Sequence, residues 1–241
     1  MDWQAHRRDA HRLGHMQENL KQIVYGGTDG IITTFAIVAG FTGAQAEGAA
    51  QIGGLAVLVF GLANLFADGV SMGLGEFLSL RSQHDLYRAR RRSERQEMAR
   101  NPQQEREELF EILRGRGLPA GEADTVTGLL MRHPRFMADL MMTYEFGLSD
   151  PEGDSPVLSA LFTLIAFLGF GAIPLVPYLL LAPDARTLVL SVGATFLALV
   201  LLGLLRWNAT GLAAHRAVAE TLLVGTLSAC VAFVVGRLVG G

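Results

Sequence analysis

Residues 52–80 read IGGLAVLVFGLANLFADGVSMGLGEFLSL, an apolar run whose only ionisable side chains are those of Asp68 and Glu76. An α-helix rises about 1.5 Å per residue, so about 20 apolar residues cross the hydrocarbon core of a bilayer. The run therefore predicts a transmembrane helix. Because it is longer than a bilayer needs, we expect the same helix to continue out of the membrane through the polar residues 81–100.

Four further apolar blocks repeat this signal along the chain. A buried helix of a soluble protein explains any single block, but a soluble domain spreads its apolar residues periodically rather than in blocks. Five blocks in one chain argue against the soluble alternative. The sequence therefore predicts an all-α, polytopic membrane protein with five transmembrane helices and a helical insert. The other four blocks are 23–43, 157–181, 186–206 and 212–238.

Charge divides the chain into membrane parts and polar parts. We expect a polar N-terminal tail at 1–22, transmembrane helices one and two within 23–80, a polar insert at 81–154, and the last three transmembrane helices within 155–241. Arginine is frequent in the tail and in the insert, whereas the 44–51 connection contains neither Lys nor Arg. The positive-inside rule then predicts that the tail and the insert lie in the cytosol.

Other features of the composition narrow the class of protein. The tail has no apolar core, so we expect no cleaved leader; a disordered cytosolic tail explains His6, His11 and His15 more simply than a metal-gathering one. The lone cysteine, Cys230, allows no disulfide within the chain. The net charge of −3 is too small to indicate a partner, and no nucleic-acid partner is predicted. The compact chain and its use of Arg over Lys suggest a prokaryotic plasma membrane.

The insert is predicted to form amphipathic helices, beginning with the extension through 81–100. Asn101 and Pro102 are typical of a new helix start, as N-cap and as first helical residue. That helix is expected to end near 115–117, where two glycines flank an arginine. Two further helices are expected at about 120–132 and 135–146, separated by His133 and Pro134, and ended by Gly147.

Ionisable residues inside the first two spans indicate a function, because each costs several kcal/mol in a bilayer unless it has a partner or water. Asp29 lies among three glycines in the segment YGGTDG, at 25–30, where another backbone or an ion can approach closely. Asp68, Met72 and Glu76 are four residues apart, and Asn64 extends the same helix face. The two spans are antiparallel neighbours, so these side chains are expected at similar depths.

Carboxylates together with a thioether favour a divalent ion of intermediate softness, such as Fe²⁺, over Mg²⁺ or Ca²⁺. Two alternatives remain from the residues alone: Met72 is a packing residue, and Glu76 sits at the membrane interface. Asp29 and Asp68 are harder to explain without a function.

The insert carries further candidate ligands. Glu94 and Glu97 are three residues apart, as are Glu105 and Glu108, and each pair shares one helix face. From the residues alone, a solvated face with ion pairs to the interleaved arginines is the simpler interpretation, and a Met-Met pair is usually core. The last helix of the insert adds Met141, Met142 and Glu145.

Two segments resemble the vacuolar iron transporter family: GTDGIITTFA at 27–36 and ADGVSMGLGE at 67–76. The resemblance covers essentially the whole chain. It implies a homodimer whose spans line a central path, exchange of Fe²⁺ for protons, and an insert that binds metal through glutamates and methionines. The family spacing replaces the solvated-face interpretation and falls on Glu94, Glu97, Glu105, Glu108, Met141, Met142 and Glu145.

The resemblance is less complete within the spans. The family's first-span aspartate corresponds to Asp29 and its second-span methionine to Met72. Its second-span glutamate position is Asn64 here, and a further aspartate is replaced by Gln22. Asp68 and Glu76 are therefore candidates to supply the missing charge.

We predict a transporter, not an enzyme, that exports cytosolic Fe²⁺ by proton antiport and needs no cofactor. Mn²⁺ and Zn²⁺ are alternative ions. The predicted partners are the lipid bilayer, divalent metal ions, protons and a second copy of the chain. Two other functions remain open: a membrane-anchored metal sensor or buffer without transport, and a transporter of another solute regulated by metal.

Overall fold

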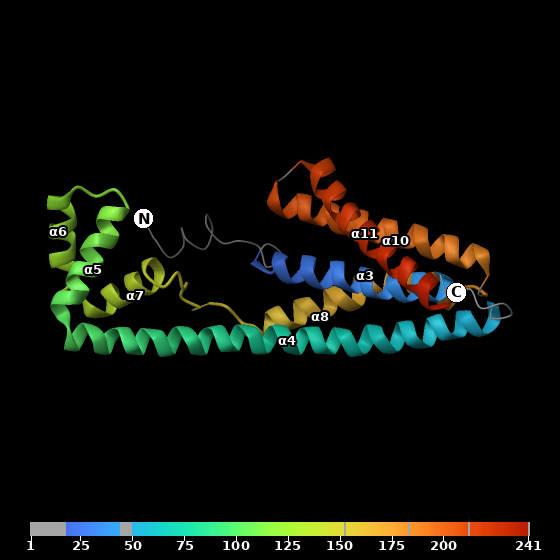
Figure 1. The fold of residues 1–241 in the computed structure, drawn as a ribbon, viewed down its shortest axis with the longest axis horizontal. Helices are drawn as coiled ribbons and strands as arrows, with labels where there is room; N and C mark the ends of the chain where they lie inside the picture. Colours follow the sequence, from blue (N-terminus) through green and yellow to red (C-terminus); the bar gives the residue numbers. More distant parts are fainter. Residues whose placement is uncertain (1–17, 44–49, 152, 183, 212, 241) are drawn as a thin grey trace, which may run out of the picture. The chain divides into compact units, whose positions relative to one another are not determined.

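The computed structural model describes residues 18–43, 50–151, 153–182, 184–211 and 213–240 (Figure 1). Residues 1–17 of the predicted N-terminal tail and most of the connection between the first two spans lie outside these ranges, and the first described long helix begins at Leu20, inside the predicted tail. Within them every regular element is a helix, so the all-α prediction is confirmed. The chain forms two compact units, one built from 1–77 with 157–241 and the other from 78–156.

Among the residues that the structure describes, five helical segments are long and apolar enough to cross a membrane, which confirms the predicted number of spans. The third span is not one continuous helix. It is interrupted at Pro174 by a short 3₁₀ turn, because proline cannot donate to the helical ladder. The elements of the first unit are α3 (Leu20–Gly43), the first part of α4 (Ala50–Arg100), α8 (Pro156–Ala172), η1 (Ile173–Leu175), α9 (Val176–Leu180), α10 (Ala185–Thr210) and α11 (Ala214–Gly240).

Glycines bring the backbone of α3 directly against the backbone of α8. A Cβ atom on Gly26 would lie 2.6 Å from the carbonyl oxygen of Thr163, and one on Gly30 would be closer still to that of Phe167. Real Cβ atoms are not found at such distances, so only glycine permits this approach. The predicted close approach of another backbone to the glycines around Asp29 is thus confirmed.

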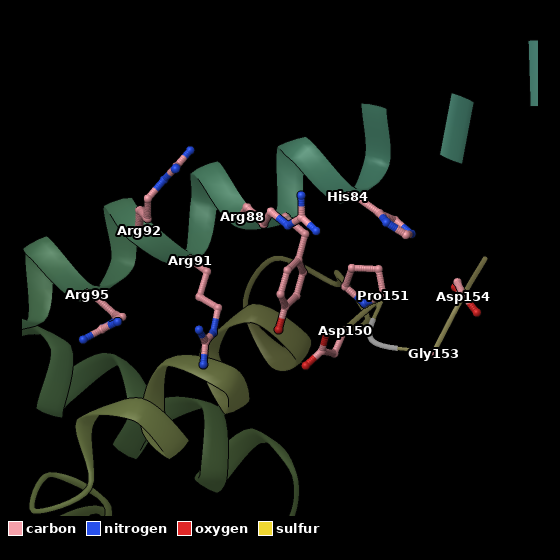
Figure 2. Close-up of a pocket in the computed structure, with 10 residues that line it drawn as sticks. His84, Arg88, Arg91, Arg92, Arg95, Asp150, Pro151, Gly153 and Asp154 are labelled. Atoms are coloured by element: carbon pink, nitrogen blue, oxygen red, sulfur yellow. The ribbon is translucent and has the colours of Figure 1, made fainter. Parts of the chain in front are cut away.

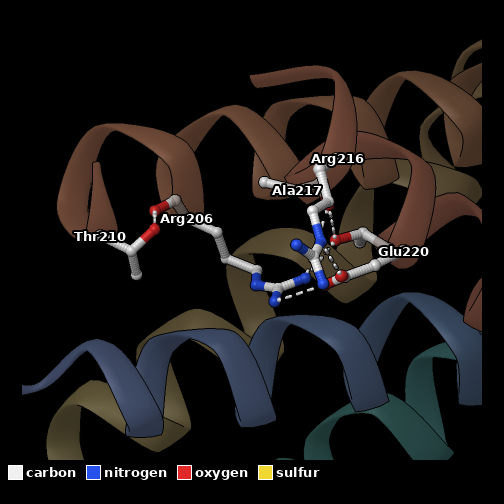
Figure 3. A network of polar contacts seen from close by, with 6 residues as sticks. Arg206, Thr210, Arg216, Ala217 and Glu220 are labelled. Carbon is white, nitrogen blue, oxygen red and sulfur yellow. Dashed lines mark hydrogen bonds and ion pairs between the residues drawn. The ribbon is translucent and has the colours of Figure 1, made fainter. Parts of the chain in front are cut away.

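Charged residues in the last two spans pair with one another (Figure 3). Arg206 of α10 donates from Nη2 to Oε2 of Glu220 on α11 at 3.2 Å, and from Nη1 to the hydroxyl of Thr221 at 3.1 Å. Arg216 donates from Nε to the other oxygen of Glu220, also at 3.2 Å. The network links the end of α10 to the start of α11, across the turn where Gly211 adopts a φ of 68°.

The second unit contains the rest of α4 and three short helices. The prediction that α4 continues through 81–100 is confirmed. The later helices are α5 (Pro102–Gly115), α6 (Ala120–Leu130) and α7 (Pro134–Tyr144). Their predicted positions are correct to about two residues. Gly147 has a φ of 65°, a left-handed conformation that suits glycine and closes the end of α7.

Asn101 is the N-cap residue of α5 and Pro102 its first residue, as predicted, but Asn101 acts through its backbone alone. The side chain of Asn101 makes no capping hydrogen bond, and its φ of −130° and ψ of 57° differ from the extended geometry typical of an N-cap. Its backbone carbonyl still accepts from the amide of Glu105. The fixed φ of Pro102 therefore starts α5 without a side-chain cap.

Replacing Gly30 with alanine is expected to destabilise the protein by about 1–3 kcal/mol, because the added methyl group meets a backbone carbonyl that no rotamer change can move. Thermal unfolding of the detergent-solubilised protein, followed by circular dichroism, measures the loss. Gly193→Ala on α10 is the matched control, since a Cβ there has open space. Equal melting temperatures for both variants would contradict the close contact.

Candidate functional site

The first cluster of candidate ligands lies in the spans. Asp29 on α3 follows Gly26 by three residues and is half-buried, as is Asp68 on α4. The two carboxyl groups are close enough to interact electrostatically. Two acids from different helices thus lie within electrostatic range of each other in the apolar unit. A cation placed between them would remove their mutual repulsion.

Asp68 and Glu76 each accept a hydrogen bond from an amide side chain. Asn64 donates from Nδ2 to Oδ2 of Asp68 at 2.6 Å, one turn along α4. Gln22 donates from Nε2 to Oε1 of Glu76 at 2.9 Å, joining α3 to α4. Asn64 and Gln22 are the two positions where the chain departs from the family pattern. The amides that replace acids therefore act as donors to the acids that are present.

Met72 lies between Asp68 and Glu76 on the same face of α4. It is half-buried and packs against a core cluster that includes Leu65 and Phe167. This contact agrees with the packing alternative. It leaves the predicted role of Met72 as a ligand without direct support.

The second cluster lies in the insert, where two carboxyl groups share a proton. Glu94 of α4 and Glu105 of α5 are only 2 % and 3 % exposed. Burial first, then the hydrogen bond to Glu105 and the charges nearby, raise the pKa of Glu94 to about 8. Glu94 is therefore the donor and Glu105 the acceptor at neutral pH. One oxygen of each, Oε1 of Glu94 and Oε2 of Glu105, has no hydrogen-bond partner among the described residues.

Three more glutamates surround this pair. The charges of Glu97 and Glu145 add to the rise in the pKa of Glu94, and those of Glu108 and Glu97 to that of Glu105. Glu145 caps the end of α7; partial desolvation of its carboxyl, followed by the charges of Glu108, Glu105 and Glu97, raises its pKa although the side chain is exposed. Five carboxyl groups from three helices thus concentrate negative charge at one place.

The charge of Arg90 opposes the rise in the pKa of Glu145, but the ion pairs of the insert's arginines go to aspartates. Arg91 pairs with Asp139 at 2.5 Å, and Arg106 with Asp124 at 2.5 Å. Across the described ranges, no ion pair joins an arginine to any of the five glutamates. The solvated-face interpretation is therefore wrong for Glu94 and Glu105, which are buried against each other.

The methionines of the insert are core residues. Met141 and Met142 have no exposed surface, and Met141 packs with Leu109 and Met137. Within the part of the chain that the structure describes, no three His, Cys, Asp or Glu side chains are arranged to hold a metal ion. The candidate glutamate ligands lie near one another, but in the described residues their side chains are not arranged around a common point where a metal ion would sit.

Sequence reasoning missed the roles of Asn64 and Gln22 as hydrogen-bond donors. The spacing of four between Asn64 and Asp68 was a usable signal, because such residues are neighbours on a helix. The contact between Gln22 and Glu76 spans 54 positions, and no local pattern indicates it.

The chain matches a known protein family and named members of it over most of its length. The model of the VIT family matches residues 20–237. The chain is 33% identical over 222 residues to Vacuolar iron transporter 1 of Arabidopsis thaliana, covering 92% of this chain and 86% of that protein. It is 32% identical over 233 residues to Vacuolar iron transporter 2 of Oryza sativa, covering 96% and 92%. It is 34% identical over 187 residues to the Vacuolar iron transporter of Toxoplasma gondii, covering 73% and 60%.

The raised pKa of Glu94 predicts an unusual pH dependence for the metal-free insert. Between the ordinary pKa of 4.5 and the folded value of about 8, the folded state keeps a proton that the unfolded state loses. The stability of the insert should therefore fall as the pH rises through this window. Glu94→Gln should flatten the dependence, because the amide does not titrate.

Urea unfolding of the detergent-solubilised protein at several pH values, followed by the helical circular dichroism signal, measures this slope. Glu107→Gln is the control, since Glu107 lies on α5 and is exposed. An unchanged slope in Glu94→Gln would show that another group causes the pH dependence.

Proposed function

The chain belongs to the VIT family, and from that premise we propose that it exports Fe²⁺ from the cytosol in exchange for protons. The observation that carries the proposal is the buried, proton-sharing pair of Glu94 and Glu105 with three more glutamates around it. On a solvated helix face, Glu94 and Glu105 would be exposed and would form ion pairs with the neighbouring arginines. A metal-binding site concentrates acids and leaves their oxygens available.

In the proposed capture step, the metal ion replaces the proton between Glu94 and Glu105. A divalent cation offsets the repulsion among the five carboxylates more effectively than one proton does. The oxygens without partners, Oε1 of Glu94 and Oε2 of Glu105, are free to take part. The side chains have to close around the ion, and Met141 and Met142 have to turn their sulfur atoms toward it. Thioether sulfur would then favour Fe²⁺ over Mg²⁺ or Ca²⁺.

In the proposed translocation step, the ion passes to Asp29 in the spans. The nearness of Asp68 to Asp29 supports a shared site, with Met72 and Glu76 on the same face of α4. The amides of Asn64 and Gln22 orient the carboxylates of Asp68 and Glu76 toward defined positions. A second copy of the chain would complete the site, and protons arriving from the far side would release the metal.

The relatives from Arabidopsis and Toxoplasma carry names that place them at a vacuole, whereas the prokaryotic plasma membrane remains a prediction from composition. Mn²⁺ and Zn²⁺ are the competing cargoes. The alternative function, a metal sensor or buffer anchored in the membrane, requires metal binding by the insert without flux.

Asp29→Asn is expected to lower Fe²⁺ flux into proteoliposomes by about tenfold or more, because the site loses a charged ligand. The flux is measured anaerobically with a metal-sensitive dye, with and without an imposed proton gradient. Glu107→Gln, which changes an exposed residue of the insert, should transport at the wild-type rate. Wild-type flux in Asp29→Asn would exclude this residue from the path. Absence of flux from the wild type, with metal binding retained, would favour the sensor.

Fe²⁺ binding to the full-length protein should tighten between about pH 6 and about pH 8 and release protons, because the carboxyl groups must ionise before they bind. Calorimetry in buffers of different ionisation enthalpy counts the protons. Glu94→Gln should bind more weakly and release fewer protons than Glu107→Gln. Binding that does not depend on pH would rule out replacement of the shared proton.

A further inference from the structure

One of the five glutamates in the insert lies beyond the end of its helix. The other four belong to α4 and α5, two on each helix, whereas α7 ends at Tyr144 and Glu145 follows it. The backbone amides of Glu145 and Phe146 both donate to the carbonyl oxygen of Met141, at 2.9 and 3.4 Å. These bonds join the turn to α7. They do not join it to the helices that carry the other glutamates.

One contact between α7 and α4 lies earlier in α7. Arg91 of α4 donates from Nε to Oδ1 of Asp139 at 2.5 Å, and Figure 2 shows the Arg91 side chain reaching from α4 toward α7. Asp139 lies in the middle of α7. This pair therefore holds α7 to α4 at one point, and the position of the turn after α7 depends on further contacts.

The two aromatic neighbours of Glu145 supply such contacts. The guanidinium carbon of Arg116, at the C-terminal end of α5, lies 4.5 Å from the centre of the Tyr144 ring. The guanidinium carbon of Arg90, on α4, lies 5.5 Å from the centre of the Phe146 ring. A cation within about 6 Å of a ring centre is attracted by the electron-rich face of the ring. One ring thus joins the turn to α5, and the other joins it to α4.

The turn needs these contacts because the carboxyl group of Glu145 lies within electrostatic range of the cluster. Desolvation, and then the charges of Glu108, Glu105 and Glu97, raise the pKa of Glu145, whereas the charge of Arg90 opposes the rise. The carboxylates of the cluster repel Glu145 when no metal ion is present. Contacts on both sides of Glu145 resist its displacement.

We propose that Tyr144 and Phe146, each stacked against an arginine, are positioning residues of the metal site: they hold Glu145 at the glutamate cluster before the ion arrives. The inference rests on the proposed capture of Fe²⁺ by the insert. A carboxylate that is already in place needs less ordering when the ion binds, so the ion binds more tightly. The rings act through Glu145 and do not themselves contact the metal.

The test is Fe²⁺ binding to the full-length, detergent-solubilised protein, measured anaerobically by calorimetry. Tyr144→Leu/Phe146→Leu removes both rings without changing any charge. It should weaken binding by about tenfold, the loss expected for two contacts of this kind. Tyr144→Phe, which keeps the ring, should lose much less affinity than Tyr144→Leu.

The matched control is Phe110→Leu. The guanidinium carbon of Arg114 lies 5.9 Å from the centre of the Phe110 ring, so this variant removes a contact of the same kind from the same insert. The residues on either side of Phe110 are not among the five glutamates. Phe110→Leu should therefore bind Fe²⁺ as the wild type does.

The Glu145→Gln background separates positioning from general stability. Removing both rings there should cause little further loss of affinity, because the carboxylate that they position is already gone. An equal loss with and without this carboxylate would overturn the inference, as would wild-type affinity in Tyr144→Leu/Phe146→Leu. Absence of Fe²⁺ binding by the wild type would instead contradict the proposed capture step, and the inference would fall with it.

Hydrogen exchange of the metal-free protein provides a measurement that does not depend on the ion. The amides of Glu145 and Phe146 should exchange faster in Tyr144→Leu/Phe146→Leu than in Phe110→Leu, because the turn is released. Equal exchange in the two variants would show that the rings do not hold the turn, and would overturn the inference.

Discussion

The contact between the backbones of α3 and α8 determines where the first acid of the chain lies. Gly26 and Gly30 face the carbonyl groups of Thr163 and Phe167 at a distance that no side chain permits. Successive residues of a helix are separated by about 100°, so Asp29 occupies a neighbouring side of α3. From there its carboxyl group comes within electrostatic range of Asp68. The glycines that allow α3 and α8 to touch therefore also set the side of α3 from which Asp29 comes within range of Asp68 on α4.

A second constraint acts throughout the molecule: an acid removed from water needs a partner. The two units of the chain supply this partner in different ways. In the spans, Asn64 and Gln22 donate amide hydrogen bonds to Asp68 and Glu76. In the insert, Glu94 keeps its proton and donates it to a second carboxylate. An amide donor is permanent, whereas a proton can be exchanged for another cation, and this difference supports the insert as the proposed place of metal capture.

Several features were predictable because they depend on neighbours along the chain. The five spans follow from the lengths of apolar runs, and the short helices of the insert from its prolines and glycines. Local signals were incomplete in two places. Asn101 has the right residue type for a cap but makes no capping bond. The third span looked uniform in hydrophobicity, yet Pro174 interrupts its ladder.

The sequence by itself determined the spans, the extension of α4 into the insert, and the face shared by Asn64, Asp68 and Glu76, because a helix repeats over short distances. Only the tertiary structure decided that Gln22 is the partner of Glu76, and that Glu94 is buried against another glutamate instead of lying on a solvated face. Burial and partnership depend on which helices pack together. Two segments with the same local sequence pattern can therefore differ in burial and in hydrogen-bond partners, because distant parts of the chain supply the contacts.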